Sequence, residues 1–115
     1  AKRLFDAYEQ DQARTSIASG YYYFGKPDLA LKFAGEAAKR SGKYLPQAHW
    51  TAGLTAWRLG KMDTSHQHFV ALSTNEYASS WTRTAGAFWA ARIDLAAGLV
   101  LWLACDARTW TRRCV

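Results

Sequence analysis

Cysteine and proline are scarce in this chain of 115 residues, which has two of each. Two cysteines are too few for a disulfide-stapled scaffold, and whether Cys105 and Cys114 are bonded stays open. Because half of the residues are hydrophobic and prolines are few, a compact folded chain is expected instead of disorder.

Long hydrophobic runs are absent too. The most apolar stretch, GLVLWLAC from Gly98, has about eight uncharged residues, where a membrane-spanning helix needs roughly 20. We therefore expect no membrane span. The first residues, Ala1 to Arg3, lead into a charged amphipathic segment without the apolar core of a signal peptide.

Acidic residues are fewer than basic ones, with nine Asp and Glu against 15 Lys and Arg and a net charge of +6. Such a charge favours anionic partners such as nucleic acid, anionic lipid or an anionic wall polymer. The basic residues are scattered through helical segments, however, so we expect a solvated basic surface and no nucleic-acid site.

Residue patterns that carry catalysis or bind metals are also missing. His66 and His68 are two residues apart on an expected helix, so they point roughly 200° apart and cannot ligate one metal together. The one acidic pair at helical spacing, Asp6 and Glu9, lies on a charged N-terminal face. Neither cysteine has a histidine close by in sequence, and no glycine-rich phosphate loop follows a strand. The sequence therefore predicts no enzyme, no metal site and no cofactor.

What the sequence does contain is a series of helices that end at glycine. PQAHWTAGLTAWRLG, from Pro46, predicts a helix that ends at Gly60. Its apolar residues recur at i, i+3, i+4 and i+7, which puts them on one face: Trp50, Gly53, Leu54 and Trp57. A second helix, TSHQHFVALS, follows with Asp63 as its expected N-cap and with Phe69 and Leu72 facing inward.

The same order of elements occurs before and after this hairpin. An earlier helix is predicted to end at Gly25, and the next begins after Pro27 with Asp28 as its cap and Leu29, Phe33 and Ala37 on one stripe. A later helix is predicted to begin at Ser79 or Ser80 and to end at Gly98. The three terminal glycines, Gly25, Gly60 and Gly98, are 35 and 38 residues apart.

A two-helix unit that recurs at this period indicates a helical repeat array, in which stacking of neighbouring units builds the core. We predict an all-α fold of tetratricopeptide-like helical hairpins, an α-α superhelix segment with about five to six helices. The array would span residues 1–98, and residues 99–115 would form an atypical tail or a capping helix. Gly53 and Gly86 interrupt helices at a cost of about 1 kcal/mol each, so we expect each to allow a close helix crossing.

Aromatic residues give the candidate binding surface. Tyr22, Trp57 and Leu95 stand three residues before the terminal glycines, where first helices of a repeat array face the concave surface, and Tyr23 and Arg58 lie beside them. Rings stack on apolar faces and arginine pairs with carboxylates, so such a groove would suit a peptide or a saccharide. The alternative is that the large aromatic residues form the core: Trp50, Trp57, Trp81, Phe88 and Trp89.

Two stretches, HWTAGLTAWRLGKMDTSHQHF at residues 49–69 and ASSWTRTAGAFWAARIDLAAG at residues 78–98, carry a family resemblance. They are similar to the helical superhelix region of soluble lytic murein transglycosylases of the alphaproteobacterial type, through W-x-x-G-L-x-x-W-R-L-G and F-W-A-A-R-x-x-L-x-x-G. The resemblance implies a non-catalytic periplasmic scaffold that normally accompanies a lysozyme-like domain with a Glu-Ser motif. In this chain Glu9, Glu36 and Glu76 are not followed by serine, so no catalytic residue carries over.

The partners that follow from these observations are peptidoglycan, by resemblance, or a protein or peptide held by an independent tetratricopeptide-like adaptor. In an array of two and a half hairpins, the last helix, which begins at Ser79 or Ser80, has no second helix to cover its apolar face. We therefore also expect a homo-oligomer through that end of the array. After Gly98 the family pattern stops, which a capping helix or an altered reading frame would explain.

Overall fold

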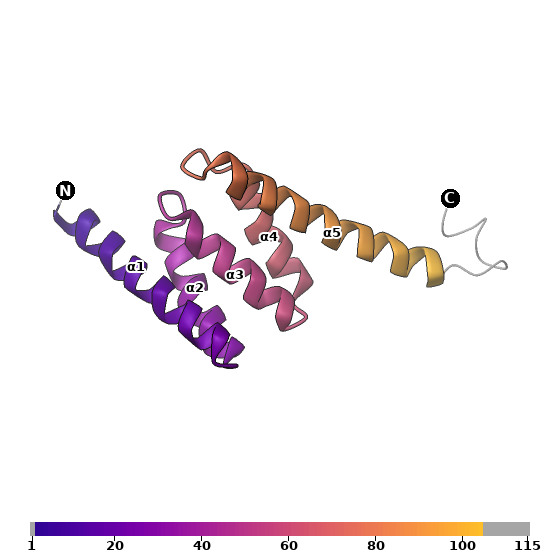
Figure 1. The fold of residues 1–115 in the computed structure, drawn as a ribbon, viewed down its shortest axis with the longest axis horizontal. Coiled ribbons are helices and arrows are strands. Elements are labelled where there is room, and N and C mark those ends of the chain that lie inside the picture. Colours follow the sequence, from indigo (N-terminus) through magenta and orange to yellow (C-terminus); the bar gives the residue numbers. More distant parts are fainter. Residues whose placement is uncertain (1, 105–115) are drawn as a thin grey trace.

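The computed structural model of the chain describes residues 2–104, which form five helices in succession and no strand (Figure 1). The helices are α1 (Lys2–Tyr23), α2 (Pro27–Ser41), α3 (Pro46–Arg58), α4 (Met62–Ser73) and α5 (Ser80–Ala104). Each helix packs on the next one, and α1 also packs on α3. This arrangement confirms the predicted all-α fold of helical hairpins.

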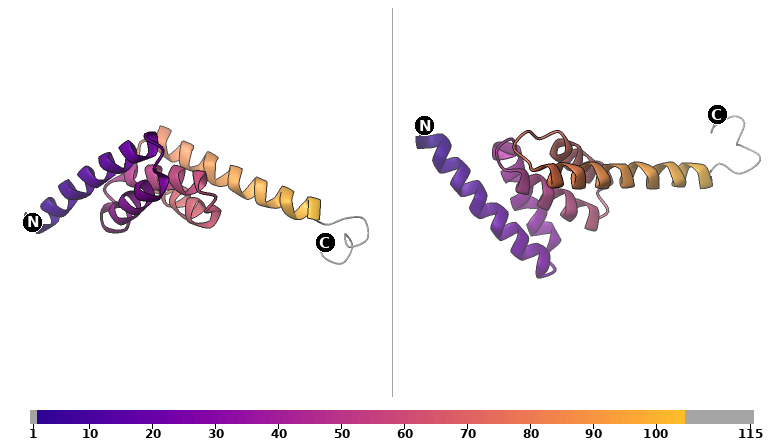
Figure 2. Two further views of the ribbon diagram at one scale, coloured as in Figure 1. Left: turned by 90° about the horizontal axis from the view of Figure 1, so that it is seen from below. Right: turned by 45° about the horizontal axis from the view of Figure 1, so that its top comes forward.

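The hairpins stack into an elongated molecule with principal extents of 62 × 30 × 22 Å. Its radius of gyration is 16.9 Å, whereas a compact domain of about 100 residues has a value near 13 Å. Figures 1 and 2 show one reason, because the C-terminal half of α5 extends past the other helices. No helix within residues 2–104 has the length and apolar composition needed to cross a bilayer.

The turns after α1 and α3 have the same backbone geometry, as the glycine positions predict. Gly25 and Gly60 have φ values of 77° and 78°, a left-handed conformation that glycine adopts without a steric penalty. The lysine after each glycine donates its N–H to a carbonyl five residues earlier, Lys26 to Tyr21 at 2.8 Å and Lys61 to Ala56 at 2.9 Å. Both helices therefore end in a Schellman motif.

The predicted N-caps of α2 and α4 are wrong. The capping positions are Lys26 and Lys61, whose side chains make no capping hydrogen bond. Asp28 and Asp63 lie two positions further on, within the first turn. There their carboxylates are favoured by the positive end of the helix dipole, so the acidic residues mark the helix starts without capping them.

The start of α5 lies where the sequence predicts it, and its end does not. Ser79 caps the helix, since its Oγ accepts the N–H of Thr82 at 3.1 Å. The helix then passes through Gly98 and continues to Ala104, so the predicted end at Gly98 is wrong. One interior glycine costs only about 1 kcal/mol. The predicted boundary between residues 98 and 99 thus falls inside a helix, and residues 105–115, with both cysteines, lie outside the described residues.

Small side chains line the contacts between the first three helices. The buried residues of α2 include Ala30, Ala34, Ala37 and Ala38, and those of α3 include Ala48, Ala52 and Ala56. Leu29, which the sequence pattern assigns to the inward stripe of α2, is instead 39% exposed. Of the predicted inward stripe, Ala37 is fully buried and Phe33 is partly buried against a core cluster, so the prediction fails only at Leu29. The neighbouring short side chains let the helix backbones approach closely.

Helices α3 and α4 approach each other closely where Gly53 of α3 meets Phe69 of α4. A Cβ atom added at Gly53 would lie 2.8 Å from the Phe69 ring, and Ser65 donates a hydrogen bond to the Gly53 carbonyl at 2.8 Å. Gly86 of α5 lies against the same helix, since a Cβ there would be 2.9 Å from the Phe69 carbonyl oxygen. Phe69 and Leu72 are fully buried. The expected packing role of both glycines and the inward position of both α4 residues are confirmed.

A buried carboxylate joins α1 to the end of α2. Asp11 is fully buried, and its Oδ2 accepts a hydrogen bond from the Ser41 hydroxyl at 2.6 Å. Its Oδ1 pairs with Arg40 at 2.6 Å and with Arg14 at 2.9 Å. Burial raises the pKa of Asp11, but these three partners outweigh that effect and hold its pKa below the ordinary value of 3.8. Asp11 is therefore ionised and satisfied at neutral pH.

We expect Gly53→Ala to destabilise the fold by about 1–3 kcal/mol, because the new methyl group meets the buried Phe69 ring. The matched control is Gly35→Ala in α2, where a Cβ meets nothing within 4 Å. There alanine should stabilise the helix by about 0.5–1 kcal/mol. Denaturant unfolding followed by circular dichroism measures both changes, and a shift of equal sign in the two variants would contradict the close packing at Gly53.

Candidate functional site

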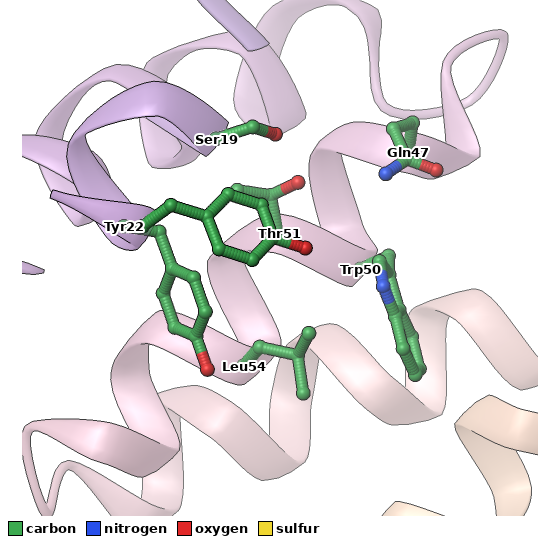
Figure 3. Close-up of a pocket in the computed structure, with 7 residues that line it drawn as sticks. Ser19, Tyr22, Gln47, Trp50, Thr51 and Leu54 are labelled. Atoms are coloured by element: carbon green, nitrogen blue, oxygen red, sulfur yellow. The ribbon is translucent and has the colours of Figure 1, made fainter. Parts of the chain in front are cut away.

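A shallow hollow of about 40 Å³ lies between α1 and α3. Its lining residues project from the two helices (Figure 3): Ser19, Tyr22 and Tyr23 from α1, and Gln47, Trp50, Thr51 and Leu54 from α3. Hydroxyl and amide groups thus lie next to aromatic rings. A space of this size admits a few water molecules, so a larger ligand would lie across the hollow and not inside it.

Arg58, the last residue of α3, crosses to the end of α1. Its guanidinium donates a hydrogen bond to the Tyr22 carbonyl at 2.8 Å, and its Cζ lies 5.2 Å from the centre of the Tyr22 ring. The carbonyl is one of those left without an intrahelical partner at the end of α1. The contact holds one face of the guanidinium on the ring, while the Arg58 side chain remains exposed.

A second arginine lies over two tryptophans at the junction of α3 and α5. Trp57 and Trp89 meet edge to face with their centroids 5.3 Å apart. The Arg92 guanidinium lies 5.7 Å from the Trp57 ring centre and 5.1 Å from that of Trp89. Attraction between the cation and the ring faces orders Arg92. Its side chain is exposed, and it forms no salt bridge with the other residues in the range 2–104.

These two clusters form one surface along the first helix of each hairpin. We call it the α1–α3–α5 surface and define it by Tyr22, Tyr23, Trp50, Leu54, Trp57, Arg58, Trp89 and Arg92. On α3 its members recur at helical spacing, because positions 50, 54, 57 and 58 lie on one side of the helix. The surface therefore continues from the hollow to the junction with α5.

The structure distributes the four predicted binding residues over this surface. Tyr22 and Arg58 are in contact, and Tyr23 meets the Tyr22 ring with a centroid distance of 5.4 Å. Trp57 faces α5 and not the hollow. Tyr23 is 84% exposed and Trp57 is 37% exposed, so both rings are accessible.

The alternative prediction, that the large aromatic residues form the core, holds for some of them. Trp50 and Trp89 pack against the buried cluster around Phe69. Trp81 and Phe88 are 84% and 60% exposed. The sequence did not single out Arg92 as a binding residue, although its position three residues after Trp89 places both on one side of a helix.

The predicted surface also omitted a pair of histidines that joins α3 to α4. His49 Nδ1 and His68 Nδ1 are 3.1 Å apart, and the ring centroids are 5.3 Å apart. The signal was present in the hairpin, because the antiparallel register that sets Trp50 against Phe69 and Gly53 against Ser65 brings residue 49 close to residue 68. At this separation one neutral imidazole donates its Nδ1–H to the Nδ1 of the other.

Burial lowers the pKa of His49. Burial also lowers the pKa of His68, and the nearby His49 charge lowers it further, to about 4. Both rings are therefore neutral at pH 7. Among the described residues no three His, Cys, Asp or Glu side chains are grouped to hold a metal ion, and the pair acts as a neutral link between the two helices.

The lowered histidine pKa values predict how stability depends on pH. The unfolded chain has an ordinary histidine pKa near 6.5, so between pH 6.5 and 4 it binds more protons than the folded chain, and the free energy of unfolding falls as pH falls through this range. Asp11, with a pKa below 3.8, titrates below this range.

We expect His68→Leu to remove the larger part of this pH dependence, as measured by thermal unfolding at a series of pH values. His66→Leu, two residues away on the partly exposed side of α4, is the matched control and should keep the fall in stability. An unchanged pH profile in His68→Leu would contradict a buried neutral pair.

The chain was compared with known protein families, with curated proteins and with solved structures, and none of the three comparisons gave a match.

Proposed function

We propose that this chain is a non-catalytic helical-repeat binding module that holds an extended, anionic ligand on the α1–α3–α5 surface. The observation that carries the proposal is the pair of arginines fixed over aromatic rings, Arg58 over Tyr22 and Arg92 over Trp57 and Trp89. A guanidinium held in place loses less conformational entropy on binding a carboxylate than a free one does. Two such groups on one surface suit a ligand that carries several anionic groups.

Peptidoglycan is the first candidate ligand. Its sugars offer apolar faces for stacking on exposed rings such as Tyr23 and Trp57, and its peptide stems carry carboxylates that pair with arginine. The resemblance to the superhelix region of lytic murein transglycosylases supports this ligand and implies a periplasmic location. In this proposal the chain acts as a scaffold that associates with the wall polymer.

A protein or peptide partner is the second candidate, with the chain as an independent tetratricopeptide-like adaptor. The polar lining of the hollow favours it, since Ser19, Gln47 and Thr51 present hydroxyl and amide groups beside Tyr22. Such groups can hydrogen-bond the backbone of an extended peptide while Arg58 pairs with an acidic side chain.

The test is retention of the purified chain on insoluble peptidoglycan. We expect binding at low salt that falls as salt rises, and a roughly ten- to thirtyfold weaker affinity for the double variant Arg58→Gln/Arg92→Gln, at about 1 kcal/mol for each lost charge-assisted contact. Arg83→Gln is the matched control, because Arg83 is exposed on α5 and lies outside the surface.

The outcomes separate the two ligands. Loss of retention in the double variant but not in the control supports peptidoglycan. No retention of the native chain, combined with arginine-dependent binding to acidic peptides in an isothermal titration, supports the adaptor instead. Equal weakening by Arg83→Gln would indicate general charge attraction and contradict a defined surface.

The proposal also includes the lack of catalysis. We expect the chain alone to leave peptidoglycan intact in a zymogram, because its glutamates lack the Glu-Ser arrangement of the family to which it is similar. A cleared band from the purified chain would contradict a purely binding role.

A further inference from the structure

One side of α5 carries large apolar side chains that none of the helices α1 to α4 covers. We call it the α5 face and define it by Trp81, Ala85, Phe88, Ala91, Leu95 and Leu99, which recur at intervals of three and four residues. Its four large members are between 53% and 84% exposed. None of the six positions is charged. At the N-terminal end, Trp81, Thr84, Ala85 and Phe88 border a groove of about 280 Å³.

The repeat tells which side of α5 this is. Gly60 and Gly98 are 38 residues apart, and the same offset relates α3 to α5. Ala48 and Ala52 of α3 are buried against clusters that include residues of α2. Their counterparts at +38, Gly86 and Ala90, are buried against α4. Each first helix thus uses equivalent positions to contact the helix before it.

The same offset shows what α5 lacks. On α3 the side that receives the following helix includes Trp50 and Gly53, which both contact Phe69 of α4. Their counterparts on α5 are Phe88 and Ala91, and both are exposed. The α5 face is therefore the position at which a further helix would pack, with Ala91 as the place of close approach.

The second half of the α5 face has no packing partner within residues 2–99. Residues 94–99 are all exposed, and Figure 2 shows this part of the helix extending away from the hairpins. Isolated helical segments are marginal in water, because most helical stability in proteins comes from packing of an apolar face. A partner that covers Leu95 and Leu99 would stabilise these turns.

The area and the pattern both suit a second copy of the same chain. The four large side chains expose roughly 500 Å² per copy, so pairing two faces buries about 1,000 Å² before flanking residues are counted, which approaches a standard stable interface. Two-fold dimers bring the same patch together from both subunits. None of the six positions is charged. Arg92 projects from the same side of α5, and its guanidinium is held over Trp57 and Trp89 at the edge of the face.

We propose that two copies of this chain associate through their α5 faces, with the two α5 helices antiparallel across a two-fold axis near residue 90. This register sets Trp81 against Leu99 of the partner subunit and Ala85 against Leu95 of the partner subunit. The stripe from Trp81 to Leu99 is about 27 Å long at 1.5 Å per residue. In this arrangement the α5 helix of each copy covers the α5 face of the other copy. The side chain of the partner's Leu99 fills the groove beside Trp81.

The test is the mass of the native chain in solution, measured by sedimentation equilibrium over a wide concentration range. We expect a reversible monomer–dimer equilibrium in the native chain. Phe88→Glu and, separately, Leu95→Glu should each shift the dissociation constant upward by at least tenfold, because each pairing buries the new charge against apolar surface. Phe24→Glu is the matched control, because Phe24 is as exposed as Trp81 but lies at the end of α1.

Leu95→Glu guards against a folding artefact, since no residue from 94 to 99 is buried and the fold of the hairpins does not depend on this side chain. The helix content of Leu95→Glu, measured by circular dichroism, should equal that of the native chain at a concentration where the native chain is monomeric. A native chain that stays monomeric at all concentrations would overturn the proposal and leave the face to another occupant. So would a dimer that both α5 variants leave intact.

Discussion

The whole array depends on how closely α3 and α4 approach each other. Because Gly53 has no side chain, the Phe69 ring can pack directly against the α3 backbone. Ser65 of α4 also donates a hydrogen bond to the Gly53 carbonyl. Phe69 in turn stacks on Trp89 of α5 at a centroid distance of 5.7 Å. One aromatic residue therefore connects three helices, and the position of Trp89 on the α1–α3–α5 surface follows from the space left by a glycine.

Sequence periodicity predicted the fold class because its signals are local. A glycine with a left-handed backbone ends a helix whatever packs around it, which is why Gly25 and Gly60 were read correctly. Gly98 is also a glycine, but no turn forms there and α5 continues to Ala104. Glycine permits the left-handed conformation without requiring it.

The buried side of each helix was harder to predict, because burial is decided by neighbours. The pattern favoured the larger Leu29, whereas the close-packed contacts select alanines such as Ala30 and Ala34. The His49–His68 pair was missed for a related reason, since it joins residues of two helices and has no spacing signal within either one. The sequence predicted four residues of the candidate site: Tyr22, Tyr23, Trp57 and Arg58. Arg92 was identified only from the structure, in which its guanidinium lies over the Trp57 ring.

The two surfaces of α5 lie next to each other on the helix. Arg92 is four residues after Phe88 and three before Leu95, so helical spacing puts it on the same side as the α5 face, while its guanidinium lies over Trp57 and Trp89. A ligand held by Arg92 would therefore bind beside the paired faces. A two-fold pair would display two copies of the α1–α3–α5 surface, and a polymeric ligand that reached both would be held by avidity without any new contact.

The buried Asp11 cluster has a consequence for the far end of α1. Sliding α1 along α2 by one turn would carry the carboxylate away from Ser41 and Arg40. The buried charge would keep Arg14 of its own helix but lose both partners on α2, which costs several kcal/mol. The register of α1 is thereby fixed. Tyr22 lies eleven residues further along the same helix, or about 16 Å, and a helix of that length behaves as a stiff rod. The contacts of Asp11 thus fix the position of α1 along α2, and with it the position at which the Tyr22 ring meets Arg58.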